Sequence, residues 1–410
     1  MPTERQLQNY AALIVKMGVN IQKDQELLIR SPIECAPFAR QIAEAGYAAG
    51  AREVTILWDD EKFSKIKYTH SPLEVFESVP DWIAESNNYY ARRGAAFVSI
   101  AAQDPDLFQL VDSAKLDAAT KASFQAFKPF YDILDVNGIA WNVVSVPTAA
   151  WAKKVYPDCE AVEAVEKLWQ AILKTVRADL DDPVAAWERH HAYLNEKVAY
   201  LNERQFARLH FKASNGTDLT LELPEGHVWA GGAERTAHGV AFFPNMPTEE
   251  VFCLPHRERV DGTAVASMPL CYQGSLIENF SLTFQNGKVV SYQAAKGEEA
   301  LKRLLETDEG ASMLGEVALV PAGSPISRLR TLFYNTLFDE NAACHLALGR
   351  AYASCIKGGL QMSKDELKAA GANDSMTHID FMIGTEDMEI TAVSKDGQET
   401  ILFHQGRWAV

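Results

Sequence analysis

The segment that says most about the fold is residues 207–223, which read A-R-L-H-F-K-A-S-N-G-T-D-L-T-L-E-L. Two runs of alternating apolar and polar residues flank Asn215-Gly216, a combination that is the strongest short signal for a β-hairpin. The same arrangement recurs around Asn286-Gly287 and around Asp396-Gly397. These three turns predict that the C-terminal half is mainly antiparallel β, interrupted by a helix over Glu298–Glu306.

Upstream of this stretch the periodicity is different. Glu26–Arg30 and Glu53–Trp58 have the composition of strands, and the alanine-rich Ala36–Gly50 between them is typical of a helix. Strand-like runs return at 95–101 and 140–146. Strands that alternate with helices over short links predict a parallel sheet covered by helices.

The period changes near Arg204, and we place a domain boundary there. A chain of 410 residues exceeds what one hydrophobic core usually serves, so two domains are expected. We predict an α/β N-terminal domain over residues 1–204 and a mainly antiparallel β (α+β) C-terminal domain over 205–410. Within the second domain, Glu340–Tyr352 is interpreted as a further helix.

Composition and charge exclude several classes of protein. The formal net charge of −16 argues against a nucleic-acid binder, which would present a basic surface. The first ten residues lack the apolar core of a signal peptide, and no run approaches the roughly 18 apolar residues of a membrane span. The six cysteines lack C-x-x-C spacing, which indicates reduced thiols in a cytoplasmic protein. Neither G-x-G-x-x-G after a strand nor G-x-x-x-x-G-K-[ST] occurs, so dinucleotide and P-loop functions have no support.

Candidate metal ligands gather near the C-terminus. Two segments, D-E-N-A-A-C-H-L-A-L-G-R-A-Y at 339–352 and T-H-I-D-F-M-I at 377–383, place charged and imidazole side chains among small and apolar residues. His378 and Asp380 lie two apart in a strand-like run, so both side chains leave the same face. The other candidates in these segments are Glu340, His345 and Tyr352.

Two further carboxylates sit where strands or strand edges are expected: Glu250 in P-T-E-E-V-F and Glu316 in G-E-V-A-L-V-P. Carboxylates suit hard divalent cations and imidazoles suit zinc and cobalt, so four carboxylates with two histidines fit a pair of metal ions. Strand alternation puts Glu249 and Glu250 on opposite faces, so only one of them can enter a shared site. The spacing alone does not choose between them.

Each donor also has a plain structural interpretation. Glu316 taken singly fits a solvated strand-edge residue, and His378 with Asp380 fits a structural pair as well as a metal site. Tyr352 fits a core or interface aromatic. His190 and His191 are interpreted as residues on a helix surface. H-E-x-x-H is absent, so no thermolysin-like zinc helix is expected.

Four segments together carry a resemblance to a known family. They read N-M-P-T-E-E-V-F, G-E-V-A-L-V-P, F-D-E-N-A-A-C-H-L-A-L-G-R-A-Y and H-I-D-F-M-I-G, and in this order they resemble the aminopeptidase T/aminopeptidase S family of metalloaminopeptidases. The resemblance covers nearly the whole chain. It implies a cytoplasmic homodimer of two-domain subunits with two divalent metal ions, zinc or cobalt, in the C-terminal domain. The metal ligands implied are Glu250, Glu316, Glu340, His345, His378 and Asp380.

The resemblance implies hydrolysis of the N-terminal peptide bond of peptides by a water activated between two metals. Glu316 or Glu340 would move the proton, Tyr352 would donate to the oxyanion, and the N-terminal domain would shape the substrate cavity. Two rivals stay open: a dinuclear hydrolase of another amide or of an ester such as a phosphate ester, and a non-catalytic peptide-binding protein.

Overall fold

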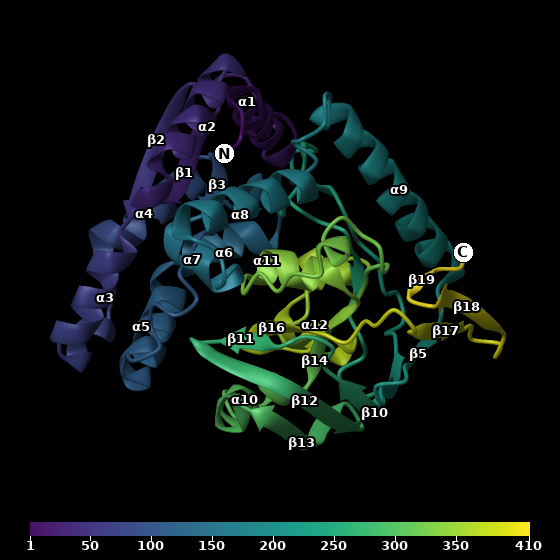
Figure 1. Ribbon diagram of the computed structural model, residues 1–410. Coiled ribbons are helices and arrows are strands. Elements are labelled where there is room, and N and C mark those ends of the chain that lie inside the picture. Colours follow the sequence, from purple (N-terminus) through teal and green to yellow (C-terminus); the bar gives the residue numbers. More distant parts are fainter. The chain divides into compact units, whose positions relative to one another are not determined.

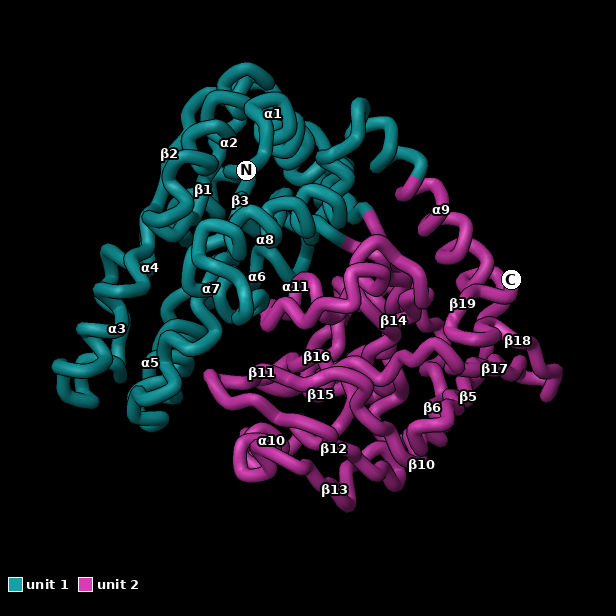
Figure 2. Tube along the Cα trace, viewed as in Figure 1, with its two compact units in different colours: residues 1–189, 233–247 teal, residues 190–232, 248–410 magenta.

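The computed structural model describes residues 1–410, and the chain forms two compact units. Unit 1 comprises residues 1–189 and 233–247, and unit 2 comprises residues 190–232 and 248–410 (Figure 2). The division therefore falls inside a long helix, some way before residue 204. A short excursion of the chain after residue 232 returns to unit 1, which the change of period did not reveal.

Unit 1 alternates strands and helices, as its sequence predicted (Figure 1). Its elements are α1 (Glu4–Leu13), β1 (Glu26–Pro32), α2 (Ala36–Ala48), β2 (Glu53–Asp59), α3 (Glu61–His70), α4 (Asp81–Arg92), β3 (Ala96–Ile100), α5 (Ser113–Ala126), α6 (Lys128–Asp135), β4 (Trp141–Val144), α7 (Ala149–Val155), α8 (Ala161–Thr175), the start of α9 (Pro183–Arg204), β7 (Glu234–Arg235) and β8 (Ala241–Phe242). A π-helical turn, Ile14–Gly18, extends α1.

The four strands β2-β1-β3-β4 form a parallel sheet, which confirms the α/β prediction. Helices cover both faces. Leu28 on β1 packs in a buried cluster with Phe130 of α6, whereas its neighbour Leu27 lies against Gly46 of α2. The alternation of side chains along a strand therefore places consecutive leucines in two different cores.

Unit 2 is mainly antiparallel β. It contains the rest of α9, β5 (Arg208–Lys212), β6 (Asp218–Glu222), β9 (Val251–Cys253), β10 (Val260–Val265), β11 (Leu270–Tyr272), β12 (Ser275–Gln285), β13 (Lys288–Lys296), α10 (Glu298–Leu305), β14 (Leu314–Leu319), α11 (Thr336–Asp339), β15 (His345–Gly349), α12 (Lys364–Ala369), β16 (His378–Met382), β17 (Glu389–Val393), β18 (Glu399–His404) and β19 (Arg407–Trp408). The three predicted hairpins are present as β5–β6, β12–β13 and β17–β18.

Two sheets of unit 2 share one core. The larger sheet has nine strands, and the smaller one, here called the site sheet, runs β16-β15-β14-β9. Phe280 from the large sheet and Phe381 from the site sheet meet in this core, with ring centroids 5.8 Å apart. One face of the site sheet thus packs in this core, and the side chains on the opposite face are not part of it.

The interpretation of Glu340–Tyr352 as a helix is wrong. A 3₁₀ turn over Glu340–Ala342 leads into β15, a strand of five buried residues that lies between β14 and β16 and pairs with both. A strand buried on both faces has no polar alternation, so its apolar run cannot be told from a helix by periodicity.

All six cysteines are free, as their spacing indicated. None of the helices combines the length and the hydropathy that crossing a bilayer requires.

Candidate metal centre

The register of the site sheet brings the candidate donors together. Glu316 on β14 and Asp380 on β16 both lie opposite Ala347 of β15. His345 is two residues from Ala347 on the same strand, and His378 is two residues from Asp380, so all these side chains share one face. The small alanine between the two carboxylates leaves room above the sheet.

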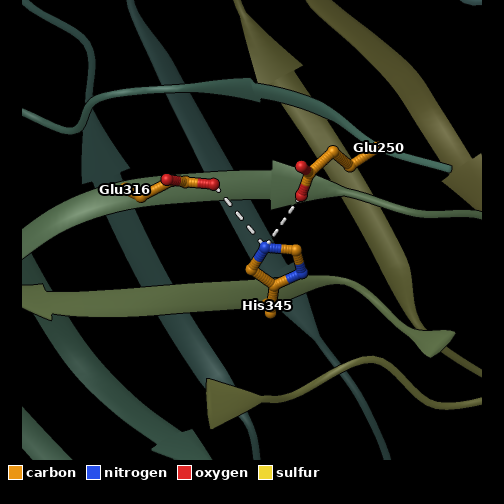
Figure 3. A group of neighbouring side chains, drawn as sticks. All are labelled: Glu250, Glu316 and His345. Atoms are coloured by element: carbon orange, nitrogen blue, oxygen red, sulfur yellow. Dashed lines mark ion pairs between the residues drawn. The ribbon is translucent and has the colours of Figure 1, made fainter. Parts of the chain in front are cut away.

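A first group consists of Glu250, Glu316 and His345. Both carboxylates face the same ring nitrogen of the histidine (Figure 3): Nε2 of His345 lies 3.1 Å from Glu250 Oε2 and 3.6 Å from Glu316 Oε1. All three side chains are buried. Glu316 belongs to an inner strand of the sheet, so the alternative of a solvated strand-edge residue does not hold for it.

A second group consists of Glu316, His378 and Asp380. His378 Nε2 lies 3.3 Å from Glu316 Oε2 and 3.5 Å from Asp380 Oδ1. Glu316 belongs to both groups, and it turns one oxygen to each histidine. The H-x-D spacing therefore places its two side chains on one face, as the sequence predicted.

Backbone carbonyls orient both imidazoles. Nδ1 of His345 lies 3.2 Å from the Ala343 carbonyl, and Nδ1 of His378 lies 2.7 Å from the Arg350 carbonyl. A carbonyl only accepts, so each Nδ1 carries the proton and donates it. Each Nε2 is then the nitrogen that faces the carboxylates, where it carries a proton without metal and would offer its lone pair to a bound cation, which is how metal-binding histidines are usually held.

These distances fit ligands that share a cation. Two ligands at about 2.1 Å from one tetrahedral ion lie about 3.4 Å apart, and the four distances from imidazole Nε2 to carboxylate oxygen span this value. The Oε2 atom of Glu250 is also buried, and its contact with His345 Nε2 lacks the geometry of a good hydrogen bond. Buried carboxylate oxygens normally accept hydrogen bonds, so this atom fits a metal ligand.

The cluster contains more carboxylates than the two histidines can neutralise. Burial raises the pKa of Glu250 and of Glu340, and the neighbouring carboxylates raise both further. Burial lowers the pKa values of His345 and His378, but hydrogen bonds and charges of the carboxylates outweigh it and raise both. The protein therefore retains protons here, in the place where divalent cations would neutralise the carboxylates.

Glu340 lies beside the two groups without belonging to either. The charges of Asp380 and Glu250 act on its carboxylate. Its Oε1 accepts a hydrogen bond of 3.3 Å from Nδ2 of Asn341, a side chain with no exposed surface. Asn341 Oδ1 in turn accepts the backbone N–H of Glu249 at 2.7 Å. Asn341 thus ties the backbone next to one candidate ligand to the carboxylate of another.

Tyr352 directs its hydroxyl into the centre. The hydroxyl oxygen lies 3.5 Å from His378 Nε2, and the tyrosine ring packs edge-on against Phe252 with centroids 5.9 Å apart. The residue is 39% exposed. Withdrawal of the hydroxyl from water, reinforced by the charges of Glu316 and Asp380, raises the pKa of Tyr352, so the phenol stays protonated and can donate.

The structure separates Glu249 from Glu250. Glu249 points away from the two groups, and its Oε2 lies 3.7 Å from Nε2 of His190. The same Nε2 atom lies 2.7 Å from the Thr248 carbonyl. The His190 side chain is 8% exposed, so its expected place on a helix surface is wrong. The partner of His190 comes from a distant segment, and helical spacing alone does not reveal it.

Sequence reasoning also missed Asn341 and the carbonyls that orient the histidines. A signal for Asn341 was present, because an amide beside Glu340 in the apolar context F-D-E-N-A must find partners once buried. The identity of those partners depends on the tertiary fold.

Comparisons with known proteins identify the family of this chain. A family model described as thermophilic metalloprotease (M29) matches residues 3–408. Aminopeptidase AmpS of Bacillus subtilis (strain 168) is 47% identical over 99% of this chain and 98% of its own, and aminopeptidase 2 of Geobacillus stearothermophilus is 48% identical with the same coverage. The solved structure of wild-type AmpT from Thermus thermophilus has a TM-score of 0.93 and 42% identity, and the match covers 99% of this chain and all of that one.

Proposed function

This chain belongs to the M29 family of metalloproteases and is a metalloaminopeptidase, and we propose that it hydrolyses N-terminal peptide bonds with two divalent ions. The ions would be held by Glu250, Glu316, Glu340, His345, His378 and Asp380. When bound, they supply Lewis acidity, which lowers the pKa of a water molecule and polarises the scissile carbonyl.

The observation that carries the two-ion proposal is the position of Glu316. Its Oε1 faces His345 and its Oε2 faces His378, so one carboxylate serves two groups of donors. Glu250 completes the first group and Asp380 the second. A carboxylate that offers one oxygen to each of two neighbouring sites suits a bridging ligand, and Glu316 is therefore our candidate for it.

The remaining side chains take the roles that their positions allow. Glu316 has both oxygens engaged, whereas Glu340 lies outside both groups, which favours Glu340 as the residue that accepts the proton of water and returns it to the leaving amine. Tyr352 would donate a hydrogen bond to the oxyanion of the tetrahedral intermediate. The surplus of carboxylates would attract the ammonium group of a peptide N-terminus.

Several further features stay proposals that rest on the resemblance to the family. We propose zinc or cobalt as the metal because the donor set mixes imidazole with carboxylate. We also propose a cytoplasmic homodimer, and an N-terminal α/β region that shapes the substrate cavity.

Metal removal and reconstitution test the proposed function. Protein dialysed against a chelator should lose turnover of an aminoacyl-nitroanilide and regain it with zinc or cobalt, while a phosphate ester is not turned over. Full activity of metal-free protein would refute the role of the ions. Preferential turnover of the phosphate ester would identify a different dinuclear hydrolase, and peptide binding without turnover would identify a binding protein.

A further inference from the structure

Unit 2 contains a cavity of about 1050 Å³ that none of the candidate metal ligands lines. Its walls are the loop before β11, the segment after β14, the loop before β17, and the turn between β18 and β19. We call it the arginine pocket, because Arg328, Arg330 and Arg407 line it. Its volume is at the upper end of the range for pockets that hold small molecules, which is about 300–1,000 Å³.

Two of the guanidinium groups converge on one glycine. Nη2 of Arg407 lies 3.8 Å, and Nε of Arg328 lies 4.0 Å, from the position that a Cβ atom would take on Gly323. Because both nitrogens lie about 4 Å from the same point, they are within about 8 Å of each other. Arg407 is on β19, and Arg328 is in the segment after β14. Both arginines are exposed, and two cations this close attract an anion that lies between them more strongly than either does alone.

The protein supplies no carboxylate to either of these two arginines. Arg330 is different, since its Nη2 lies 2.9 Å from Oε1 of Glu386, which also lines the pocket. The local excess is thus two positive charges in a chain whose net charge is −16.

The arginine pocket adjoins the metal centre along the chain. Ala342, Ala343 and Cys344 form part of its wall, and these residues are the link between Glu340 and His345. Gly384, also in the wall, donates its N–H to the Cys344 carbonyl at the end of the site sheet. The backbone of residues 342–344 therefore lies between the pocket and the candidate ligands that flank it in the sequence, and a peptide that reached both sites would pass over this backbone.

We propose that the arginine pocket binds the free carboxylate of a short peptide substrate, held by Arg328 and Arg407. The proposal rests on the proposed function, since the same peptide would place its N-terminus at the metal centre. Planar guanidinium groups match a carboxylate with paired hydrogen bonds, and the volume accommodates several residues of peptide. The enzyme would then prefer short, unblocked peptides over peptides whose C-terminus is amidated.

The test compares peptides from two to five residues long, each as the free acid and as the C-terminal amide, on metal-loaded enzyme. At the length that spans the two sites, kcat/KM for the acid should exceed that for the amide by about tenfold, the effect of one or two charge-assisted hydrogen bonds at an accessible site. In the double variant Arg328→Gln/Arg407→Gln this ratio should fall to about one. The matched control is Arg303→Gln, which removes an exposed charge from α10 outside the pocket and should keep the wild-type ratio.

Equal turnover of acid and amide by the wild type at every length would overturn the proposal, and so would a ratio that survives in the double variant. Inorganic phosphate should inhibit turnover of the acid competitively. If calorimetry shows that phosphate binds through Arg328 and Arg407 without such inhibition, the pocket serves a free anion and the peptide assignment is wrong.

Failure of the proposed function would look different, because the aminoacyl-nitroanilide, which has no carboxylate, would not be hydrolysed either. In that case the phosphate titration decides on the pocket: binding that the double variant loses supports an oxyanion site there, and no binding to the wild type refutes it.

Discussion

Replacing Asn341 with leucine should weaken metal binding although the residue is not itself a candidate ligand. The side chain is fully buried, with Oδ1 accepting from the Glu249 N–H and Nδ2 donating to the Leu337 carbonyl at 3.0 Å and to Glu340. Leucine has a similar shape and makes none of these bonds. The Glu249 N–H would be left buried and unpaired, at a cost of about 1–3 kcal/mol.

The effect on the metal centre follows from the same contacts. The freed Glu249 amide precedes Glu250, and Glu340 loses a hydrogen bond that fixes its carboxylate, so two candidate ligands become less well placed. Loss of an outer hydrogen-bond partner typically lowers metal affinity about 10- to 100-fold. We expect that range for Asn341→Leu, measured by competition with a chelator of known affinity.

A matched control is Asn202→Leu, in the same unit. Asn202 exchanges two hydrogen bonds with the backbone of Trp229, at 2.8 and 2.9 Å, and touches no candidate ligand. Both variants should lower the melting temperature of the metal-free protein, but only Asn341→Leu should lower metal affinity. Affinity for metal within a factor of two of the wild type in Asn341→Leu would refute the reasoning.

Three other substitutions test Tyr352, Glu316 and Glu61. Tyr352→Phe should lower kcat by about 10²–10³ with both metals retained, because it removes only an oxyanion donor; near wild-type kcat on an aminoacyl substrate would leave Tyr352 as a packing residue. Glu316→Gln should reduce the bound metal below one ion per chain, whereas loss of a single ion would mean that Glu316 serves one group only. Burial is the main cause that raises the pKa of Glu61 to about 7 in the folded protein. Between pH 4.5 and 7 the folded protein therefore keeps a proton on Glu61 that the unfolded chain releases. The free energy of unfolding should fall as the pH rises through this range. Glu61→Gln should therefore gain thermal stability over the wild type between pH 5 and pH 8, and melting curves with parallel pH dependence would contradict this.

The sequence predicted those features of the fold that depend on short-range patterns. The hairpins at Asn215-Gly216 and Asn286-Gly287 form because asparagine and glycine readily adopt the positive φ angles of tight turns. Asn286, Gly216 and Gly287 all have positive φ. The shared face of His378 and Asp380 followed from strand alternation alone.

Features that depend on distant partners could not be predicted from local pattern. β15 has no alternation because neighbours cover both of its faces, so its run of apolar residues was taken for a helix. Glu249 faces His190 instead of the candidate ligands, and His190 lies far from it in sequence. The role of Asn341 likewise depends on a hydrogen bond to a backbone amide from another segment.

The central claim is that one chain holds two metal ions that share Glu316. Measurement of metal per chain by plasma mass spectrometry, on protein stripped with a chelator, reloaded with zinc or cobalt and freed of excess ion, tests it most directly. We expect two ions per chain at full aminopeptidase activity. Full activity with one ion per chain, or with none, would contradict it.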